Sequence, residues 1–246
     1  MTEMRNDSIA DGANENYRDA EKPIVSSAVI RRLPRYFRYL RALIRQGKHR
    51  ISSAELSRIM NVTASQIRQD LNCFGGFGQQ GYGYNVNYLY AKICELLGVG
   101  NGFHAIVIGA GNLGRALVKN PMFEKRGVDV IGMFDIAPDT VGHSVGDVRI
   151  MHIDTLGDFC RRNKVDIAVL TLPKEHADGV VEKIVEYGIP GIWNFTGKEF
   201  KIDNGRTVVE EIHLGDSLMT LCYEISRRNE EPASENIESY DDFDGE

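Results

Sequence analysis

Hydrophobic and polar positions repeat with a helical period in the first third of the chain. From Pro34, the apolar residues Phe37, Leu40 and Ile44 recur at spacings of three and four. Proline is tolerated in a first helical turn, and Gly47 stands where the helix would end. The pattern therefore predicts an amphipathic helix that begins at Pro34.

Two shorter helices are predicted next. Ser52 and Glu55 have the spacing of a capping box, in which each side chain bonds the backbone N–H of the other residue. Thr63 can cap a third helix whose apolar residues Ile67 and Leu71 face inward. Two short helices joined by a turn predict a helix-turn-helix, whose second helix reads DNA. The side chains pointing outward near the start of this helix are Ser65, Gln66, Arg68 and Gln69.

Glycine and aromatic residues alternate directly after the third helix, from Phe74 to Val86. Glycines in this pattern predict a β-hairpin with a tight turn. A flexible glycine-rich linker is the alternative, but linkers seldom carry four aromatic residues so close together. The hairpin is interpreted as the wing of a winged helix.

A second pattern begins near residue 103, where strand and helix signals alternate. Phe103–Ile108 is an apolar run typical of a buried strand, and a GxGxxG motif then opens a helix through Lys119. The first glycine allows a tight turn, the second lets the backbone approach a pyrophosphate, and the third lets the helix pack closely on the strand. The helix N-terminus attracts the negative charge. The predicted phosphate-binding residues are Gly109, Ala110, Gly111, Asn112, Leu113 and Gly114.

A carboxylate stands at the end of the next strand. Val128–Phe134 is followed by Asp135, which is 21 residues after Gly114. In dinucleotide-binding folds, an acid at this spacing bonds the adenosine ribose hydroxyls. Because Asp135 would also repel a 2′-phosphate, the sequence favours NAD(H) over NADP(H). A tight turn without a ligand is the alternative, and the combination of strand, glycines, helix, strand and acid counts against it.

The alternation continues toward the C-terminus. Strands are predicted at Val165–Thr171 and Gly191–Phe195, with a helix at Glu175–Tyr187 between them. This order predicts an α/β fold with a doubly wound (Rossmann) parallel sheet, which binds ligands beyond the carboxyl ends of its strands. The candidate walls of a nicotinamide site are Thr171, Leu172, Pro173, Asn194, Phe195 and Thr196.

A final amphipathic helix is predicted near the C-terminus. Leu214, Leu218, Leu221 and Ile225 follow helical spacing and form an apolar stripe that requires a partner. The stripe either packs on its own domain or is exchanged between two subunits. Exchange is a real alternative because helix-turn-helix proteins usually bind two half-sites as symmetric dimers.

Charge along the chain changes the picture that the average gives. The 246 residues carry a net charge of −6, which by itself counts against a nucleic-acid partner. Residues 23–72, however, hold ten basic and two acidic side chains, a balance of +8. No acid lies between Arg31 and Arg50 to pair with the arginines of the first helix, so this segment predicts an anionic partner. The arginines on the polar side of that helix are Arg35, Arg38, Arg41 and Arg45.

Five segments follow from these patterns. Residues 1–22 and 229–246 are polar, acidic and poor in large apolar groups, and we expect them to be disordered. Residues 23–90 are expected to form the winged helix, 91–212 the dinucleotide-binding domain and 213–228 the terminal helix. No apolar run is long enough for a membrane span and no secretory signal is present, so we expect a cytoplasmic protein without a membrane partner.

An oxidoreductase is one alternative function. It would need a general acid or base beside the nicotinamide, and His176 and Lys174 are the best placed. The chain has no further domain to enclose a substrate, so both are interpreted as surface groups and no catalytic residue is predicted. The histidines lack metal-ligand spacing, and no metal site is predicted. A repressor that senses CoA or another nucleotide is a second alternative, and Asp135 counts against it.

Several segments, in their order along the chain, are typical of a single family. They are Arg32–Leu40, Ser52–Leu56, Gln66–Leu71, Gly81–Val86, the GxGxxG motif and Phe134–Asp135. Over residues 23 to 226, the chain resembles the Rex family of bacterial redox-sensing transcriptional repressors.

The resemblance implies a homodimer with an N-terminal winged helix, an NAD(H)-binding domain and a terminal helix exchanged between subunits. It also implies that NADH binding releases double-stranded operator DNA, whereas NAD+ permits repression. At matching positions, the implied DNA contacts are Arg32, Arg35, Ser65, Gln66, Arg68, Gln69 and Tyr82. The implied cofactor contacts are Gly109 to Gly114 and Asp135.

The chain departs from the family pattern at several positions. Gln79 and Gln80 stand in the wing where basic residues are frequent. Asn120 and His213 stand where some members have a tyrosine and an aspartate that take part in switching. The segment 196–198, Thr-Gly-Lys, is also unusual. Because histidine titrates near neutral pH, we expect an altered or pH-sensitive redox response.

Overall fold

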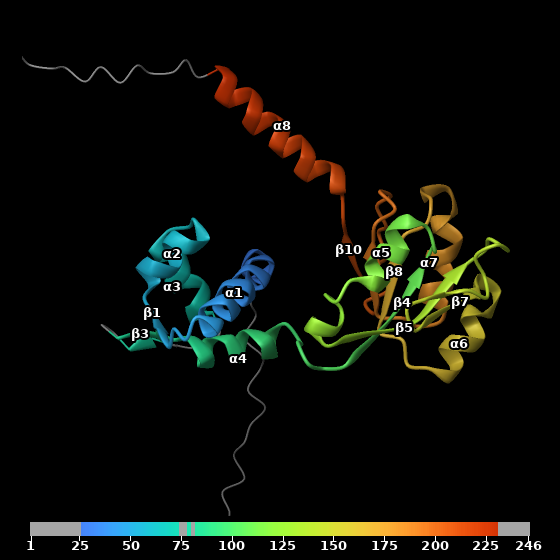
Figure 1. The fold of residues 1–246 in the computed structure, drawn as a ribbon, viewed down its shortest axis with the longest axis horizontal. Helices are drawn as coiled ribbons and strands as arrows, with labels where there is room; N and C mark the ends of the chain where they lie inside the picture. Colours follow the sequence, from blue (N-terminus) through green and yellow to red (C-terminus); the bar gives the residue numbers. More distant parts are fainter. Residues whose placement is uncertain (1–25, 74–77, 80–81, 231–246) are drawn as a thin grey trace, which may run out of the picture. The chain divides into compact units, whose positions relative to one another are not determined.

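The computed structural model describes residues 26–73, 78–79 and 82–230, and the chain divides into two compact units (Figure 1). The units are Met1–Gly98 and Val99–Glu246. Of the segments where we expect disorder, residues 1–22 and 231–246 lie outside the described residues. Asn229 and Glu230, also expected to be disordered, instead belong to the last helix. Within the described part of the chain, no helix is long and apolar enough to cross a membrane.

In its described residues, the N-terminal unit combines four helices with a small antiparallel sheet. Its strands lie in the order β1-β3-β2, and its helices bury a common core. The core is formed by side chains such as Tyr36, Leu40, Leu56, Ile67, Leu71, Leu89 and Ile93. The elements are α1 (Ser27–Arg45), β1 (Arg50–Ile51), α2 (Ser53–Met60), α3 (Ala64–Asn72), β2 (Gly78–Gln79), β3 (Gly83–Asn85) and α4 (Val86–Leu96).

Helix α1 starts earlier than predicted, because Pro34 lies inside it rather than in its first turn. The Ser26 side chain caps the helix by accepting a bond from the backbone N–H of Val29. Val29 and Leu33 are buried and extend the apolar stripe by two turns. Pro34 only removes the hydrogen bond to the carbonyl of residue 30, an exposed position where water can replace it.

The predicted caps and hairpin are present. Ser52 and Glu55 form the full capping box at the start of α2, and the Thr63 side chain caps α3. Strand β2 pairs antiparallel with β3, as the wing requires, while Phe74, Phe77 and Gln80 lie outside the described residues.

Helix α4 was not predicted, and the boundary expected between residues 90 and 91 lies inside it. Val86, Leu89 and Ile93 have helical spacing and are buried, so the signal was present in the sequence. The helix packs on α1, where Tyr90 stacks on Phe37 with ring centroids 5.3 Å apart.

The C-terminal unit is built on a seven-stranded sheet. Its order is β10-β9-β8-β4-β5-β7-β6, in which every pair is parallel except β6 with β7. This is the doubly wound order, so the predicted Rossmann-type sheet is confirmed. Strands β6, β7 and β10 were not predicted. The bounds are β4 (Phe103–Ile108), β5 (Val128–Asp135), β6 (Ser144–Val145), β7 (Val148–His152), β8 (Ile167–Leu170), β9 (Gly191–Asn194) and β10 (Val208–Glu211).

Alternate residues of each strand fill opposite faces of this sheet. On β4, Ile106 and Ile108 join a core cluster with side chains of α6 and α7. Ala105 and Val107 join a second cluster, with α5 beside it. The helices are α5 (Asn112–Lys119), α6 (Leu156–Arg162) and α7 (Ala177–Glu186), with short 3-10 turns η1 (Glu124–Arg126), η2 (Ile153–Thr155) and η3 (Lys174–His176).

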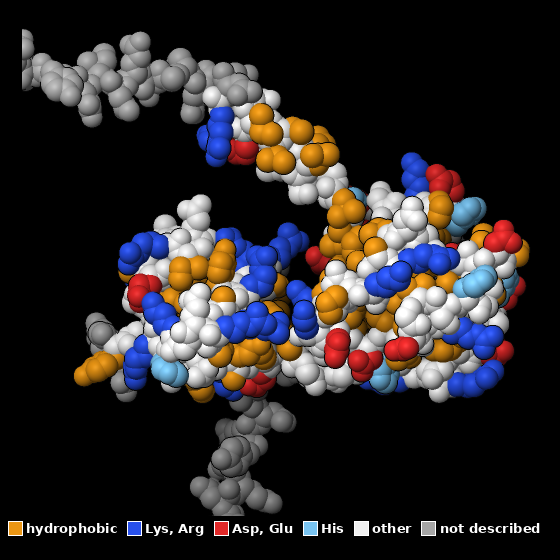
Figure 2. Space-filling view, in the orientation of Figure 1, with side chains coloured by type: hydrophobic (Ala, Val, Ile, Leu, Met, Phe, Trp, Pro, Cys, Tyr) orange, Lys and Arg blue, Asp and Glu red, His pale blue; other side chains and the backbone are white. Residues whose placement is uncertain are grey.

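The last helix, α8 (Leu214–Glu230), exposes its hydrophobic side chains. Figure 2 shows them gathered along the helix. Between 51% and 72% of each of these side chains is exposed. The exposed hydrophobic residues of α8 are Leu214, Leu218, Met219, Leu221, Tyr223 and Ile225.

Candidate functional site

The start of α3 presents polar side chains in the way that the sequence predicted. Ser65, Arg68 and Gln69 are exposed and Gln66 is half-buried. Arg68 is the only one of them tied to α2 among the described residues, through a 3.3 Å hydrogen bond from Nη1 to Ser53 Oγ. The N-terminal half of a recognition helix is the part that reaches DNA bases.

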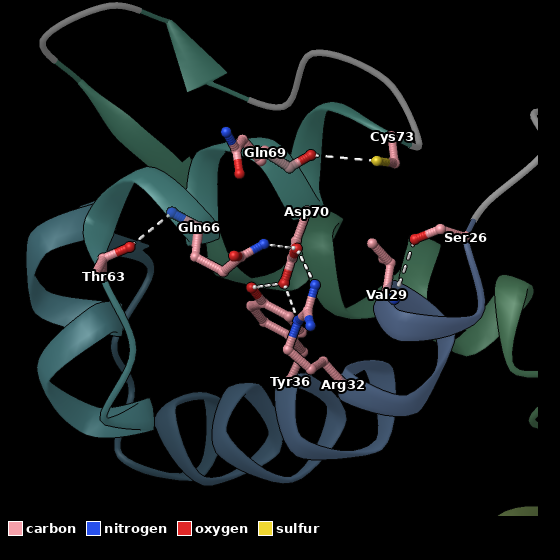
Figure 3. A network of polar contacts seen from close by, with 9 residues as sticks. All are labelled: Ser26, Val29, Arg32, Tyr36, Thr63, Gln66, Gln69, Asp70 and Cys73. Atoms are coloured by element: carbon pink, nitrogen blue, oxygen red, sulfur yellow. Dashed lines mark hydrogen bonds and ion pairs between the residues drawn. The ribbon is translucent and has the colours of Figure 1, made fainter.

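A buried carboxylate lies between α1 and α3 (Figure 3). Asp70 is fully buried and accepts two hydrogen bonds of 2.7 Å from Arg32, one to each oxygen. Tyr36 donates to Oδ2 at 2.9 Å and Gln66 Nε2 donates to Oδ1 at 2.8 Å. Sequence reasoning missed this network, although the i, i+4 spacing of Gln66 and Asp70 was a usable signal.

The network shifts the pKa values of its members. Burial alone would raise the pKa of Asp70, but the hydrogen bonds from Arg32, Gln66 and Tyr36 outweigh it and lower the pKa below its usual value. Burial, together with the bond to Asp70, raises the pKa of Tyr36 well above its usual value. Asp70 is therefore an ionised acceptor that fixes the donors around it.

Arg32 and Arg35, both expected to contact DNA, bond within the protein. Arg32 is paired with Asp70, and Arg35 Nη2 donates to the backbone oxygen of Met60 at 2.5 Å, at the end of α2. Each bond joins α1 to one helix of the helix-turn-helix. Both residues thus hold the two helices of the helix-turn-helix against α1.

The wing also has an internal support. Arg50 Nη1 donates to the backbone oxygen of Tyr82 at 3.1 Å, and its guanidinium carbon lies 5.9 Å from the centroid of the Tyr82 ring. The Tyr82 side chain is 70% exposed. Tyr82 is therefore presented to solvent by an arginine from the neighbouring strand.

Most of the positive charge of this unit is free to act on a partner. Of the ten basic side chains in residues 23–72, only Arg32 and Lys48 form ion pairs with acids among the described residues. Lys and Arg side chains are spread over the surface of this unit in Figure 2. Such a surface attracts a polyanion.

A pocket of about 580 Å³ lies at the carboxyl ends of β4, β5 and β8. Its size is suited to a small ligand or cofactor. Six residues predicted to bind the cofactor line it: Gly109, Gly111, Asp135, Thr171, Leu172 and Pro173. His176, which the sequence placed beside the nicotinamide, also lines the pocket, from the turn before α7. Other lining residues were not predicted, namely Ile136 and Ile153 after two strands and Gly179, Val180 and Lys183 along one face of α7.

The three glycines of the motif are required for different structural reasons. At Gly109, which has φ of +106°, a Cβ would lie 2.7 Å from the Thr171 backbone, and at Gly114 it would collide with the Gly109 oxygen. At Gly111 a Cβ would meet nothing within 4 Å. Packing therefore requires the first and third glycines, whereas Gly111 leaves open space beside the pocket, which fits the close approach of a pyrophosphate.

Asp135 is held at the edge of the pocket by backbone groups. Its Oδ2 accepts the N–H of Ala110 at 2.5 Å, and its Oδ1 accepts those of Ile136 and Ala137 at 2.7 and 2.8 Å. The carboxylate thus connects the end of β5 to the glycine loop. This is the position from which an acid reaches ribose hydroxyls.

Three predicted wall residues, Asn194, Phe195 and Thr196, do not line the pocket. Asn194 is buried, and its amide bonds the Lys198 backbone oxygen and the Glu211 carboxylate. Phe195 packs on Trp193, with ring centroids 4.7 Å apart. None of the three lines the pocket, because β9 is farther from the crossover point between β4 and β8.

A winged helix with a basic surface and a Rossmann-type pocket in one chain define a class of protein, the ligand-responsive transcriptional regulator. Two family models match, "DNA-binding protein N-terminus" over residues 24–72 and "CoA binding domain" over residues 103–197. Curated relatives narrow the class. The chain is 51% identical over 212 residues to the redox-sensing transcriptional repressor Rex of Thermoanaerobacter sp. (strain X514), covering 86% of this chain and 93% of the relative.

The Rex protein of Caldicellulosiruptor bescii is 50% identical over 208 residues, covering 85% of this chain and 95% of the relative. Solved structures agree. RSP in complex with beta-NAD+ and operator DNA has a TM-score of 0.78 at 49% identity, covering 84% of this chain and 94% of RSP. RSP with beta-NADH has a TM-score of 0.77 at 46% identity, covering 84% and 96%. The chain belongs to the Rex family of redox-sensing transcriptional repressors, and these relatives are repressors rather than enzymes.

Proposed function

We propose that this protein represses transcription by binding double-stranded operator DNA through its winged helix, and that NADH binding releases it. The observation that carries the proposal is the combination, in one chain, of a basic winged helix with a dinucleotide pocket. RSP, which has the same fold, was solved with NAD+ and operator DNA and with NADH. Because DNA and NAD(H) are intracellular ligands, we propose a cytoplasmic location.

The proposed DNA contacts fall into two groups. Ser65, Arg68 and Gln69 of α3 and Tyr82 of the wing are exposed and can contact bases and phosphates directly. Arg32 and Arg35 are bonded within the protein but retain further N–H groups that can reach a phosphate. Gln66 belongs to the same surface and is treated separately below.

The proposed cofactor is NAD(H), bound along the pocket of the C-terminal unit. The glycine loop, with the start of α5, would hold the pyrophosphate, and Asp135 would bond the adenosine ribose. Thr171, Leu172 and Pro173, after β8, would lie beside the nicotinamide. The bound cofactor would supply no chemistry here beyond the charge of its ring, which differs between NAD+ and NADH.

We propose a homodimer in which α8 is exchanged between the subunits. The stripe formed by Leu214, Leu218, Leu221 and Ile225 is exposed along its length, and so large an apolar surface favours burial against a second copy. Reduced nicotinamide is uncharged and can be buried against Leu214, whereas the oxidised ring is a cation and resists that contact. NADH would then favour the dimer state that does not bind DNA, since only a ligand with unequal affinity shifts the equilibrium.

A repressor that senses CoA remains a second candidate, because a family model described as a CoA binding domain matches residues 103–197. Asp135 argues for NAD(H). Adenosine in CoA carries a 3′-phosphate, and a carboxylate bonding the ribose hydroxyls would repel it.

The test is a titration of NADH, NAD+ and CoA against a preformed complex of the protein with an operator fragment. We expect NADH to release the DNA at a concentration at which NAD+ and CoA do not. Equal release by NADH and NAD+ would contradict redox sensing, and release by CoA alone would support the second candidate. Repetition at several salt concentrations separates phosphate contacts, which set the salt slope, from cofactor coupling.

A further inference from the structure

The orientation of the Gln66 amide is fixed by the protein before DNA arrives. Asp70 is ionised and can only accept hydrogen bonds, so the amide must turn its Nε2 toward Oδ1, at 2.8 Å. The amide oxygen Oε1 then lies on the other side of the group. An isolated glutamine, in contrast, could present either end.

The anchor itself cannot rotate. Asp70 is fully buried, and each of its oxygens accepts a bond from Arg32, while Tyr36 donates to Oδ2. The network therefore holds Gln66 between α3 and α1, as Figure 3 shows. Less side-chain entropy is lost when such a group binds its ligand.

The groups of Gln66 that remain available form an acceptor and a donor side by side. No described residue donates to Oε1, and Nε2 has a second N–H besides the one given to Asp70. Gln66 is half-exposed and is the third residue of α3, within the turn that reaches into the major groove. Adenine presents the complementary pair there, the N6 amino donor and the N7 acceptor, whereas guanine presents two acceptors.

We infer that Asp70 orients the Gln66 side chain so that it reads adenine at one position in each operator half-site. Gln66 is the base-reading residue, and Asp70 is a positioning residue that acts through it. The inference rests on the proposed function, because it requires that α3 binds operator DNA.

Gln69 provides a matched control within the same helix. It carries the same amide but is exposed, and in Figure 3 its side chain points away from Asp70. The hydrogen bonds to Asp70 among the described residues come from Arg32, Tyr36 and Gln66, so loss of Asp70 should not change what Gln69 reads.

The experiment selects binding sites from randomised double-stranded DNA with NAD+ present, using the full-length wild type, Gln66→Ala, Asp70→Asn and Gln69→Ala. We expect the wild type to enrich an adenine that Gln66→Ala no longer prefers, with discrimination against guanine at that position falling about five- to 150-fold. In Asp70→Asn, the new side-chain amide can also donate a hydrogen bond to Gln66 Oε1, so the Gln66 amide can take either orientation. This variant should therefore lose the same preference at the same position. Gln69→Ala should keep it.

Failure of the inference is distinguishable from failure of the proposed function. If the wild type enriches no sequence, operator binding itself is refuted. If it enriches a site whose adenine preference survives Gln66→Ala, the reading role of Gln66 is wrong. If Gln66→Ala loses the preference but Asp70→Asn retains it, the positioning role of Asp70 is wrong. Gln66 is half-exposed, so Gln66→Ala is expected to fold, and far-UV circular dichroism of each variant checks this.

Discussion

At the scale of single residues, the DNA-binding unit depends on a charge buried between two helices. A buried carboxylate is costly unless hydrogen bonds satisfy it, and removing one partner usually costs more than the pair itself contributes. Asp70 meets this requirement with donors from Arg32, Tyr36 and Gln66. Removal of even one small donor group should therefore lower the stability of this unit markedly, because it leaves the buried carboxylate short of a hydrogen bond.

Tyr36→Phe removes one donor without changing the packed ring. Because the bond goes to an ionised group in a buried site, we expect the free energy of unfolding of the N-terminal unit to fall by about 1.5 to 3 kcal/mol. Urea unfolding followed by far-UV circular dichroism measures this. Tyr39→Phe, on the same helix at a half-exposed position, is the control and should change it little. Equal effects of the two substitutions would contradict the role given to Tyr36.

The capping box of α2 predicts a pH dependence. Lys48, followed by the backbone and side chain of Ser52, lowers the pKa of Glu55 from 4.5 to about 2. A carboxyl group whose pKa is lower in the folded than in the unfolded protein stabilises the fold at pH values above its unfolded-state pKa. This stabilisation is lost as the pH falls toward the folded-state pKa. The contribution is reduced by solvent, because the Glu55 side chain is 40% exposed.

We therefore expect the urea midpoint of the N-terminal unit to fall less in Glu55→Gln than in the wild type between about pH 6 and about pH 3. Asp70 also has a lowered pKa and contributes to the fall in both proteins, so the difference between the two curves is the informative quantity. Parallel curves would show that ionisation of Glu55 adds no pH-dependent stability to the N-terminal unit, contrary to its lowered pKa.

At the scale of elements, the two glycines Gly111 and Gly114 at the junction between β4 and α5 have different roles. Gly114 lets the helix approach the strand, since a Cβ there would meet the Gly109 oxygen and lie 2.7 Å from Thr171 Oγ1. Gly111 has open space around it and an extended backbone that alanine can adopt. Packing inside this unit therefore requires a glycine at position 114 but not at position 111.

Gly114→Ala should destabilise the C-terminal unit by several kcal/mol, because backbone must move to admit the methyl group. Gly111→Ala should cost under about 1 kcal/mol but weaken NADH binding, because the methyl group occupies the path of the pyrophosphate. The fluorescence of the single tryptophan, Trp193, reports unfolding of this unit, and calorimetric titration reports binding. Unchanged NADH affinity in Gly111→Ala would contradict the proposed site.

At the scale of the whole molecule, the apolar stripe of α8 is the feature that a single chain does not bury. Leu218 and Leu221 are 61% and 55% exposed. Burial of such a stripe against a second copy would be driven mainly by the hydrophobic effect. A dimer would also let two recognition helices bind two half-sites at once.

Leu218→Asp combined with Leu221→Asp places charges in the stripe and should convert the protein to a monomer that binds operator DNA at least about tenfold more weakly. Sedimentation equilibrium gives the mass, and a filter-binding titration gives the affinity. Ser217→Asp, exposed on the same helix but outside the stripe, should remain a dimer. A doubly substituted protein that stays dimeric would contradict the proposed interface.

Much of the fold was predictable because its signals are local. Capping boxes, the 3.6-residue period and the GxGxxG spacing depend on residues close together in the chain, so the helix-turn-helix, the strand-glycine-helix unit and Asp135 were found. The predicted start of α1 at Pro34 is wrong because the helix accommodates this proline in its interior. Strand β10 was missed because its half-exposed residues carry little apolar signal.

Local sequence patterns were enough to predict the class of each unit and the chemistry that it offers, a basic DNA-binding unit and a dinucleotide pocket. Which polar groups meet across elements depends instead on how the helices and strands pack together. Arg32 and Asp70 are 38 residues apart, and their pairing makes Arg32 an internal support as well as a proposed DNA contact. Asn194 and Phe195 leave the pocket for the same reason, since strand order rather than local sequence decides which strand ends adjoin the ligand.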